Sequence, residues 1–148
     1  MKPLAPFTAA NPAVAGGSAS QMAHAQFLRL ESPADIRNQL AQAKRNGTPV
    51  MLDFYADWCI SCKVMERNVF SNDSVIQALS PYTLLQLDMT DNTPAQQALL
   101  EELGLFGPPA ILFYGNDGAE LETARILGEM DREQFLGHLN ALDMSGGS

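Results

Sequence analysis

The 148-residue sequence has little positive charge, few cysteines and no long apolar run. Its 9 Lys and Arg residues are outnumbered by 17 Asp and Glu residues, so the formal net charge is −8 and no basic stripe is left for a phosphate backbone. No stretch approaches the ~20 apolar residues that a membrane-spanning helix needs. We therefore expect no nucleic acid among its partners and no attraction to an acidic membrane surface.

One folded domain is expected, because 46% hydrophobic content is enough for a chain of this length to bury a core. Residues 1–25 are rich in Ala, Pro, Gly and Ser and are expected to be a flexible linker or a cloning remnant. Residues 26–143 should form the domain, followed by a disordered tail at 144–148. No internal repeat is visible, and we expect the isolated domain to be a monomer.

The sequence contains only two cysteines, Cys59 and Cys62. A disulfide between them would close a loop too short to add much stability, so the pair indicates thiol chemistry rather than a structural staple. A zinc site would need more ligands, but there is no second cysteine pair, and His24 and His138 fall in the tail and on the last expected helix. We therefore expect no metal, and no cofactor beyond a redox-active Cys59–Cys62 disulfide.

Apolar runs and helical patterns alternate along the chain. Strands are expected at 26–30, 50–55 and 82–89, and helices at 32–46, after Cys59, at 74–79 and at 93–104. Two further runs, 110–114 and 120–127, flank a Gly-Asn-Asp-Gly turn and should form an antiparallel hairpin before a last helix from Asp131 to about Leu142. This order predicts an α/β fold with a mixed central sheet and helices on both faces.

The two cysteines should have different roles. Cys59 is expected at the first turn of its helix, where unpaired N–H groups favour a thiolate, so it is the candidate nucleophile. Cys62 lies one turn further along and would resolve the mixed disulfide. The strand at 50–55 delivers both residues to the start of the helix.

Two carboxylates are expected near the cysteines. Asp53 points from the buried strand under the site, and Glu66 lies on the same helix face as the thiols. We expect both acids to be ionised. One negative charge at ~6 Å and an effective dielectric of ~20 destabilises a thiolate by ~3 kcal/mol. This exceeds the roughly 0.3 to 2 kcal/mol by which the helix N-terminus stabilises the thiolate. This predicts a raised pKa for the Cys59 thiol and a reductant rather than an oxidant, with Asp53 accepting the Cys62 proton.

Structural interpretations of the same residues stay open. Asp53 is also compatible with a satisfied buried acid, and Glu66 with an ordinary solvated helix residue. Trp58 can be simple packing, and Pro109 an ordinary turn proline. None of these alternatives needs the residue to take part in chemistry.

The segment Trp58-Cys59-Ile60-Ser61-Cys62-Lys63, with Asp53 before it and Pro109 opening a later strand, resembles the thioredoxins. More narrowly, residues 52–59, Glu66, 84–90 and 110–114 resemble the C-terminal periplasmic domains of the DsbD family of bacterial transmembrane reductases. The resemblance covers about 27–142 and implies a thioredoxin-like fold. It also implies that Pro109 is a cis-proline facing the thiols and that Trp58, Pro108 and Pro109 bind the substrate.

The resemblance implies a protein-disulfide reductase. Its donor would be the transmembrane domain of the same protein and its acceptor the N-terminal periplasmic domain, and the location would be periplasmic, as a domain of an inner-membrane protein. A second enzyme hypothesis is a free-standing thioredoxin or a cytochrome-maturation reductase of the same fold. A non-enzymatic alternative is a binding module in which the disulfide only shapes a docking surface.

Overall fold

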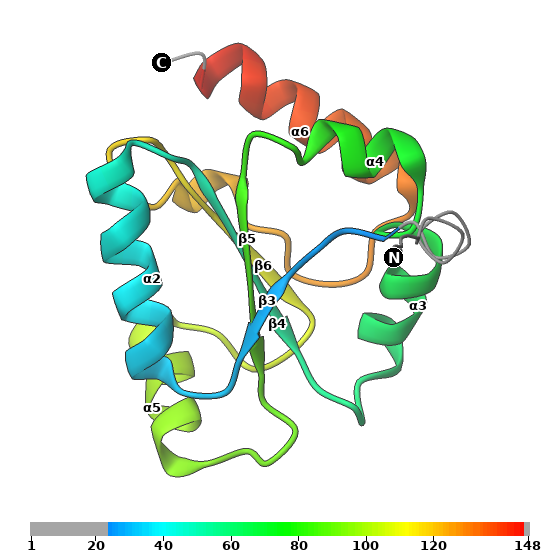
Figure 1. The fold of residues 1–148 in the computed structure, drawn as a ribbon. Coiled ribbons are helices and arrows are strands. Elements are labelled where there is room, and N and C mark those ends of the chain that lie inside the picture. The colour runs from blue at the N-terminus through cyan, green and yellow to red at the C-terminus, as the bar shows by residue number, and fades with distance from the viewer. Residues whose placement is uncertain (1–23, 147–148) are drawn as a thin grey trace, which may run out of the picture.

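The structure, a computed structural model, describes residues 24–146 (Figure 1). Most of the expected linker and the last two residues of the expected tail lie outside this range. The strands are β3 (Leu28–Leu30), β4 (Val50–Tyr55), β5 (Thr83–Asp88) and β6 (Ala110–Tyr114). The helices are α2 (Pro33–Asn46), α3 (Ile60–Asn68), α4 (Asp73–Ala78), α5 (Pro94–Leu103) and α6 (Arg132–Gly146).

The strands of the described range form one mixed sheet in the order β3-β5-β4-β6. β3, β5 and β4 are parallel, and β6 is antiparallel to β4. All six residues of β4 are buried, as expected for a strand with a neighbour on each side and helices above and below. The expected mixed sheet is therefore confirmed, and the cysteines follow its central strand.

Each face of the sheet is covered by its own group of helices (Figure 1). α2 and α5 pack on one face around Leu52, Phe54 and Leu87. α3, α4 and α6 pack on the other face, where Met51 meets Phe70 and Phe135. Because side chains alternate along a strand, the residues of β4 on either side of Leu52 and Phe54 point toward α3 rather than α2.

Helices α2 and α5 begin and end where local sequence signals predict. Ser32 caps α2, with its hydroxyl accepting from the Asp35 amide, and Gly47 ends it at a positive φ of 68°. Thr93 forms a capping box with Gln96 at the start of α5. These signals act within a few residues of the helix ends, which is why sequence reasoning finds them.

The second strand of the expected hairpin does not form. The segment 120–127 meets β6 only at two isolated bridges, Ile111 with Ile126 and Tyr114 with Glu120. Between them the chain turns through a 3₁₀ segment, η1 (Glu122–Ala124). Arg125 Nε donates to Glu120 Oε2 at 2.6 Å, whereas a regular strand would hold residues five apart at ~17 Å and on opposite faces. This ion pair accompanies the interruption of the strand.

The last helix begins as expected and ends later. Asp131 Oδ1 accepts from the Gln134 amide at 2.8 Å, and Gln134 Oε1 accepts from the Asp131 amide at 3.0 Å, which together cap the N-terminus of α6. The helix continues to Gly146, beyond the expected end near Leu142. At the other end of the domain, β3 is shorter than the expected strand at 26–30.

Candidate active site

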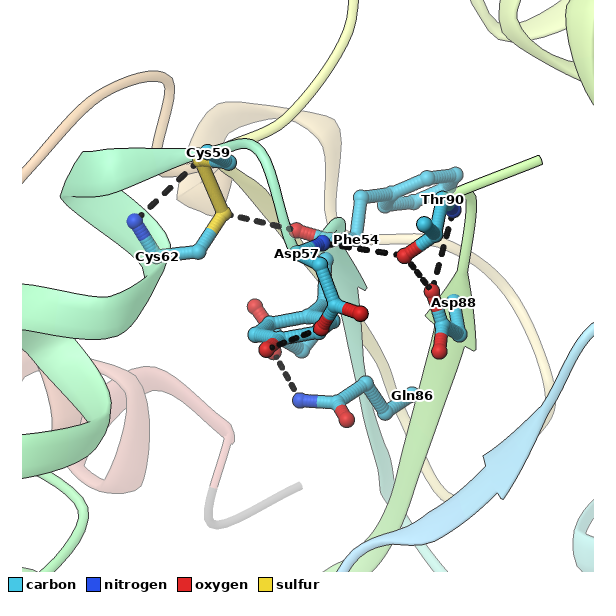
Figure 2. Close-up of a disulfide and its surroundings, with 9 residues drawn as sticks. Phe54, Asp57, Cys59, Cys62, Gln86, Asp88 and Thr90 are labelled. Carbon is cyan, nitrogen blue, oxygen red and sulfur yellow. Dashed lines mark hydrogen bonds between the residues drawn. A yellow bond between two sulfur atoms is a disulfide. The ribbon is translucent and has the colours of Figure 1, made fainter. Parts of the chain in front are cut away.

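A disulfide joins Cys59 to Cys62 at the start of α3, with the two Cα atoms 5.3 Å apart (Figure 2). Cys59 is the N-cap residue, and the Cys62 amide donates toward its Sγ over 3.2 Å. A helix N-terminus with a donor aimed at this sulfur favours negative charge on it. Cys59 therefore occupies the position of the nucleophile.

Cys62 lies against the end of β4. Its Sγ is 3.7 Å from the Phe54 carbonyl oxygen, where a thiol S–H can donate once the disulfide is reduced (Figure 2). Both cysteines are only 6% exposed. A partner must therefore approach closely, over the residues that surround the disulfide.

Asp53 is buried on β4, with 6% of its surface exposed. Burial raises its pKa from 3.8 to about 7, a hydrogen bond from Gln86 opposes this rise, Glu66 adds to it and Arg29 lowers it. A pKa near 7 lets Asp53 take up or release a proton near neutral pH. The expectation of an ionised Asp53 did not include this rise, which arises because a carboxylate under a central strand loses its hydration.

The register of three strands places a polar row across the sheet, and its middle residue, Gln86, lies in the surroundings of the disulfide (Figure 2). Arg29 on β3 is the partner of Gln86 on β5, and Gln86 is the partner of Asp53 on β4. Gln86 Nε2 donates to Asp53 Oδ2 at 2.7 Å, and Arg29 Nε donates to Gln86 Oε1, also at 2.7 Å. The row therefore links the exposed edge of the sheet to the buried acid.

Glu66, on α3, does not stand as an isolated charge. Arg29 Nη2 donates to Glu66 Oε2 at 3.2 Å, and the Glu66 side chain is 26% exposed. A paired and partly hydrated carboxylate repels a thiolate less than the bare charge assumed from the sequence. Together with the raised pKa of Asp53, this pairing weakens the expected repulsion between the carboxylates and a Cys59 thiolate at neutral pH. The repulsion should increase as the pH rises and Asp53 ionises.

Trp58 is held beside the disulfide by the loop after β5. Its Nε1 donates to the Thr90 carbonyl at 3.1 Å, and the residue is 56% exposed. The Thr90 hydroxyl accepts from the Asp57 amide at 2.9 Å and donates to Asp88 Oδ1 at 2.5 Å (Figure 2). The indole is thus fixed at its edge and leaves much of its surface open.

Pro108 and Pro109 lie next to the same end of the sheet. The bond between them is cis, in agreement with the expectation for Pro109. Ala110, which follows, is paired with Phe54, whose carbonyl touches Cys62. The structure therefore brings Pro109 to the end of β4, beside the disulfide.

Four contributors to the site were not singled out from the sequence: Arg29, Gln86, Asp88 and Thr90. Gln86 and Asp88 alternate as polar residues with the apolar Leu85 and Leu87 in β5, and this is the signal that could have found them. Arg29 gave no such signal, because it lies on a short edge strand far from the cysteines in sequence. Its role depends on strand order.

Among residues 24–146, no group of three or more His, Cys, Asp or Glu side chains is arranged to hold a metal ion. Over the same range, no helix is both long and apolar enough to cross a bilayer.

The family model of a thioredoxin-like domain matches residues 36–143. The chain belongs to the thioredoxin-like family. A disulfide at the start of the helix that follows the central strand, in this fold, makes the domain a disulfide oxidoreductase. The expected thioredoxin-like fold is confirmed.

Individual relatives and a solved structure show that, within this family, the chain is similar to DsbD proteins. The chain is 45% identical over 138 residues to the thiol:disulfide interchange protein DsbD of Klebsiella pneumoniae, covering 93% of this chain and 22% of that protein. It is 41% identical over 140 residues to DsbD 2 of Pseudomonas aeruginosa, covering 95% and 23%. The DsbD C-terminal domain of Neisseria meningitidis, in its oxidised form, superposes with a TM-score of 0.64 at 38% identity, covering 74% of this chain and 94% of that domain.

The expected resemblance to DsbD is therefore confirmed. The chain spans less than a quarter of the length of these two full-length relatives, and the part that it matches in the solved structure is the C-terminal domain. It is a thiol-disulfide reductase domain similar to that of DsbD.

Proposed function

We propose that this domain relays two electrons by dithiol–disulfide exchange, from the transmembrane domain of a DsbD-like protein to its N-terminal periplasmic domain. The periplasmic location, as part of an inner-membrane protein, belongs to the same proposal. Similarity to the DsbD C-terminal domain of Neisseria meningitidis and to full-length DsbD proteins supports it. A relay domain must cycle, and the Neisseria meningitidis domain has been solved in both oxidised and reduced forms.

The first step is attack by Cys59. In the reduced domain its thiolate attacks one sulfur of the acceptor disulfide, a Cys59–acceptor bond forms, and the other acceptor sulfur leaves as a thiolate that takes a proton from solvent. The Cys62 amide aimed at Cys59 Sγ supports the assignment of the nucleophile.

The second step is resolution by Cys62. Its thiol gives a proton to the Asp53 carboxylate, and its sulfur attacks Cys59 Sγ. The second acceptor sulfur leaves as a thiolate that takes a proton from solvent, so the acceptor departs as a dithiol carrying two electrons. A pKa of about 7 suits Asp53 for this transfer, since near neutral pH it can accept the proton and return it when the domain is reloaded. The single observation that carries the proposal is the Cys59–Cys62 disulfide at a helix N-terminus, in a domain that superposes on the DsbD C-terminal domain.

Exposed apolar side chains next to the cysteines in sequence and before the cis-proline would receive the partner. Trp58, Ile60 and Phe106 are 56%, 79% and 106% exposed, and Phe106 stands three residues before Pro109. With Pro108 and Pro109 they would form the substrate-binding surface. A protein partner that covers this surface buries apolar area, whereas a small disulfide does not. A change in this surface should therefore affect exchange with proteins and not exchange with small disulfides.

Trapping tests the proposed partner. With Cys62→Ser the mixed disulfide of Cys59 cannot be resolved, so the oxidised N-terminal domain of the same protein should accumulate as a covalent adduct. The measurement is a non-reducing gel with mass analysis, before and after addition of dithiothreitol. The control is the double variant Cys59→Ser with Cys62→Ser, which should give no adduct.

Two results would count against the proposal in different ways. An adduct with an unrelated disulfide peptide but not with the N-terminal domain would contradict the partner and favour a free-standing thioredoxin. No adduct with either would contradict exchange through Cys59 and favour a binding module.

The aromatic residue of the partner surface should matter for proteins and not for small thiols. Phe106→Thr is expected to lower kcat/KM for a protein partner about tenfold, since burying an aromatic anchor is worth at least ~1.4 kcal/mol at an interface. Oxidation of the reduced domain by a small disulfide should keep its rate. The matched control is Leu28→Thr, an exposed residue on β3, at the far edge of the sheet from β6. Equal losses in both variants, or loss with the small disulfide, would contradict this surface.

A further inference from the structure

The Gln86 amide can face only one way. Arg29 Nε is an obligate donor and sits 2.7 Å from Gln86 Oε1, so the amide oxygen must turn toward Arg29. The amide nitrogen is then left to face Asp53, where it donates to Oδ2 at 2.7 Å. Arg29 makes no hydrogen bond to Asp53 among those described. By fixing the Gln86 amide, it nevertheless places the amide N–H, and not the amide oxygen, against the Asp53 carboxyl.

A donor in that position distinguishes the two states of Asp53. An ionised carboxylate accepts from Gln86 more strongly than a neutral acid does, so the fixed amide favours the charged state. Were the amide free to reverse, its oxygen could accept from a protonated Asp53 and favour the neutral state instead. The orientation set by Arg29 therefore has a chemical consequence at the buried acid.

Arg29 also balances the charges around the row. Its Nη2 binds Glu66 Oε2 at 3.2 Å, and its Nη1 lies 3.8 Å from Asp88 Oδ2. Its Cζ lies over the Tyr55 ring, 4.5 Å from the ring centre. Asp53 itself is influenced by Glu66 from α3, Arg29 from β3 and Gln86 from β5. Arg29 and Gln86 both favour the ionised form of Asp53, and Gln86 does so in the orientation that Arg29 fixes.

We propose that Arg29 is a positioning residue for the exchange reaction: by orienting Gln86 and pairing with Glu66, it keeps Asp53 available as a carboxylate beneath Cys62. This inference rests on the proposed role of Asp53 as the group that takes the Cys62 proton. Arg29 acts from the edge of the sheet and touches neither sulfur in the contacts described above. Its side chain is 45% exposed, so replacing it leaves no cavity in the core.

The test is a titration of the Asp53 carboxyl carbon by NMR, with the disulfide intact. Arg29→Met removes both the donor and the charge, and the Asp53 pKa, about 7 in the native domain, should rise by ~1 pH unit. Arg29→Lys restores the charge without the forked donor and should give a pKa between these two. The matched control is Arg37→Met, which breaks the exposed ion pair with Glu102 and should leave the pKa of Asp53 unchanged.

The same variants carry a kinetic readout. A rise of ~1 pH unit lowers the ionised share of Asp53 at pH 7 from about one half to about one tenth, so resolution by Cys62 should slow about fivefold there and recover at higher pH. An unchanged Asp53 pKa in Arg29→Met, or an equal shift in Arg37→Met, would overturn the inference. Failure of the proposed function looks different: Asp53→Asn would then resolve mixed disulfides at the native rate, whatever Arg29→Met does to the titration.

Discussion

Protein-to-protein exchange should fall to the uncatalysed background when Cys59 is replaced by alanine. The chain has only two sulfur atoms that can form a disulfide, and Cys59 is the one at the helix N-terminus with a backbone donor aimed at it. Cys62 lies against the Phe54 carbonyl, which favours a protonated thiol there. Reduction of insulin by dithiothreitol, followed as turbidity with and without the domain, measures the loss.

Two variants make the result specific. Ser61→Ala changes a residue between the cysteines without removing either sulfur, and exchange should persist. Cys62→Ala keeps the nucleophile, so a burst of mixed disulfide should still form although turnover stops. Exchange that survives in Cys59→Ala and disappears in Cys62→Ala, with no burst, would reverse the assigned roles of the two cysteines.

The part of the site that is local in sequence could be predicted. A buried strand that leads directly into Cys59 places the disulfide at the start of a helix, and the caps at Ser32 and Thr93 define neighbouring helices by contacts within four residues. The cis bond at Pro109 followed from the resemblance and is present. In each case the decisive interactions join residues close in the chain or belong to a family pattern.

The rest depends on contacts between distant segments. The link from Arg29 through Gln86 to Asp53 needs the order and register of three strands, which no single stretch of sequence encodes. The raised pKa of Asp53 was not predicted for a related reason, since it reflects burial by distant segments rather than residue type. Likewise, the Glu120–Arg125 ion pair accompanies a turn where the apolar pattern indicated a strand.

Burial of Asp53 should make the oxidised domain lose stability as the pH rises. The folded pKa of about 7 lies above the ordinary value of 3.8, so between these two pH values the folded state binds more protons than the unfolded state. The free energy of unfolding therefore falls across this window and levels off above it, by on the order of 4 kcal/mol in total. Asp53→Asn should remove this part of the pH dependence. Urea denaturation at several values from pH 4 to pH 8, with the disulfide intact, measures it.

The slope, rather than the absolute stability, is the informative quantity. The asparagine can still accept from Gln86, but its own amide hydrogens need new partners, and a missing partner costs about 1 to 3 kcal/mol at every pH. Subtracting the Asp53→Asn curve from the native curve cancels the other titrating groups, while Asp91→Asn, at an exposed turn, should keep the native slope. Parallel curves for the native domain and Asp53→Asn would mean that Asp53 ionises in the fold as readily as in the unfolded chain. That result would remove the physical basis for Asp53 as a proton acceptor near neutral pH. The positioning role of Arg29, which acts on Asp53 through Gln86, would then have no group to act on.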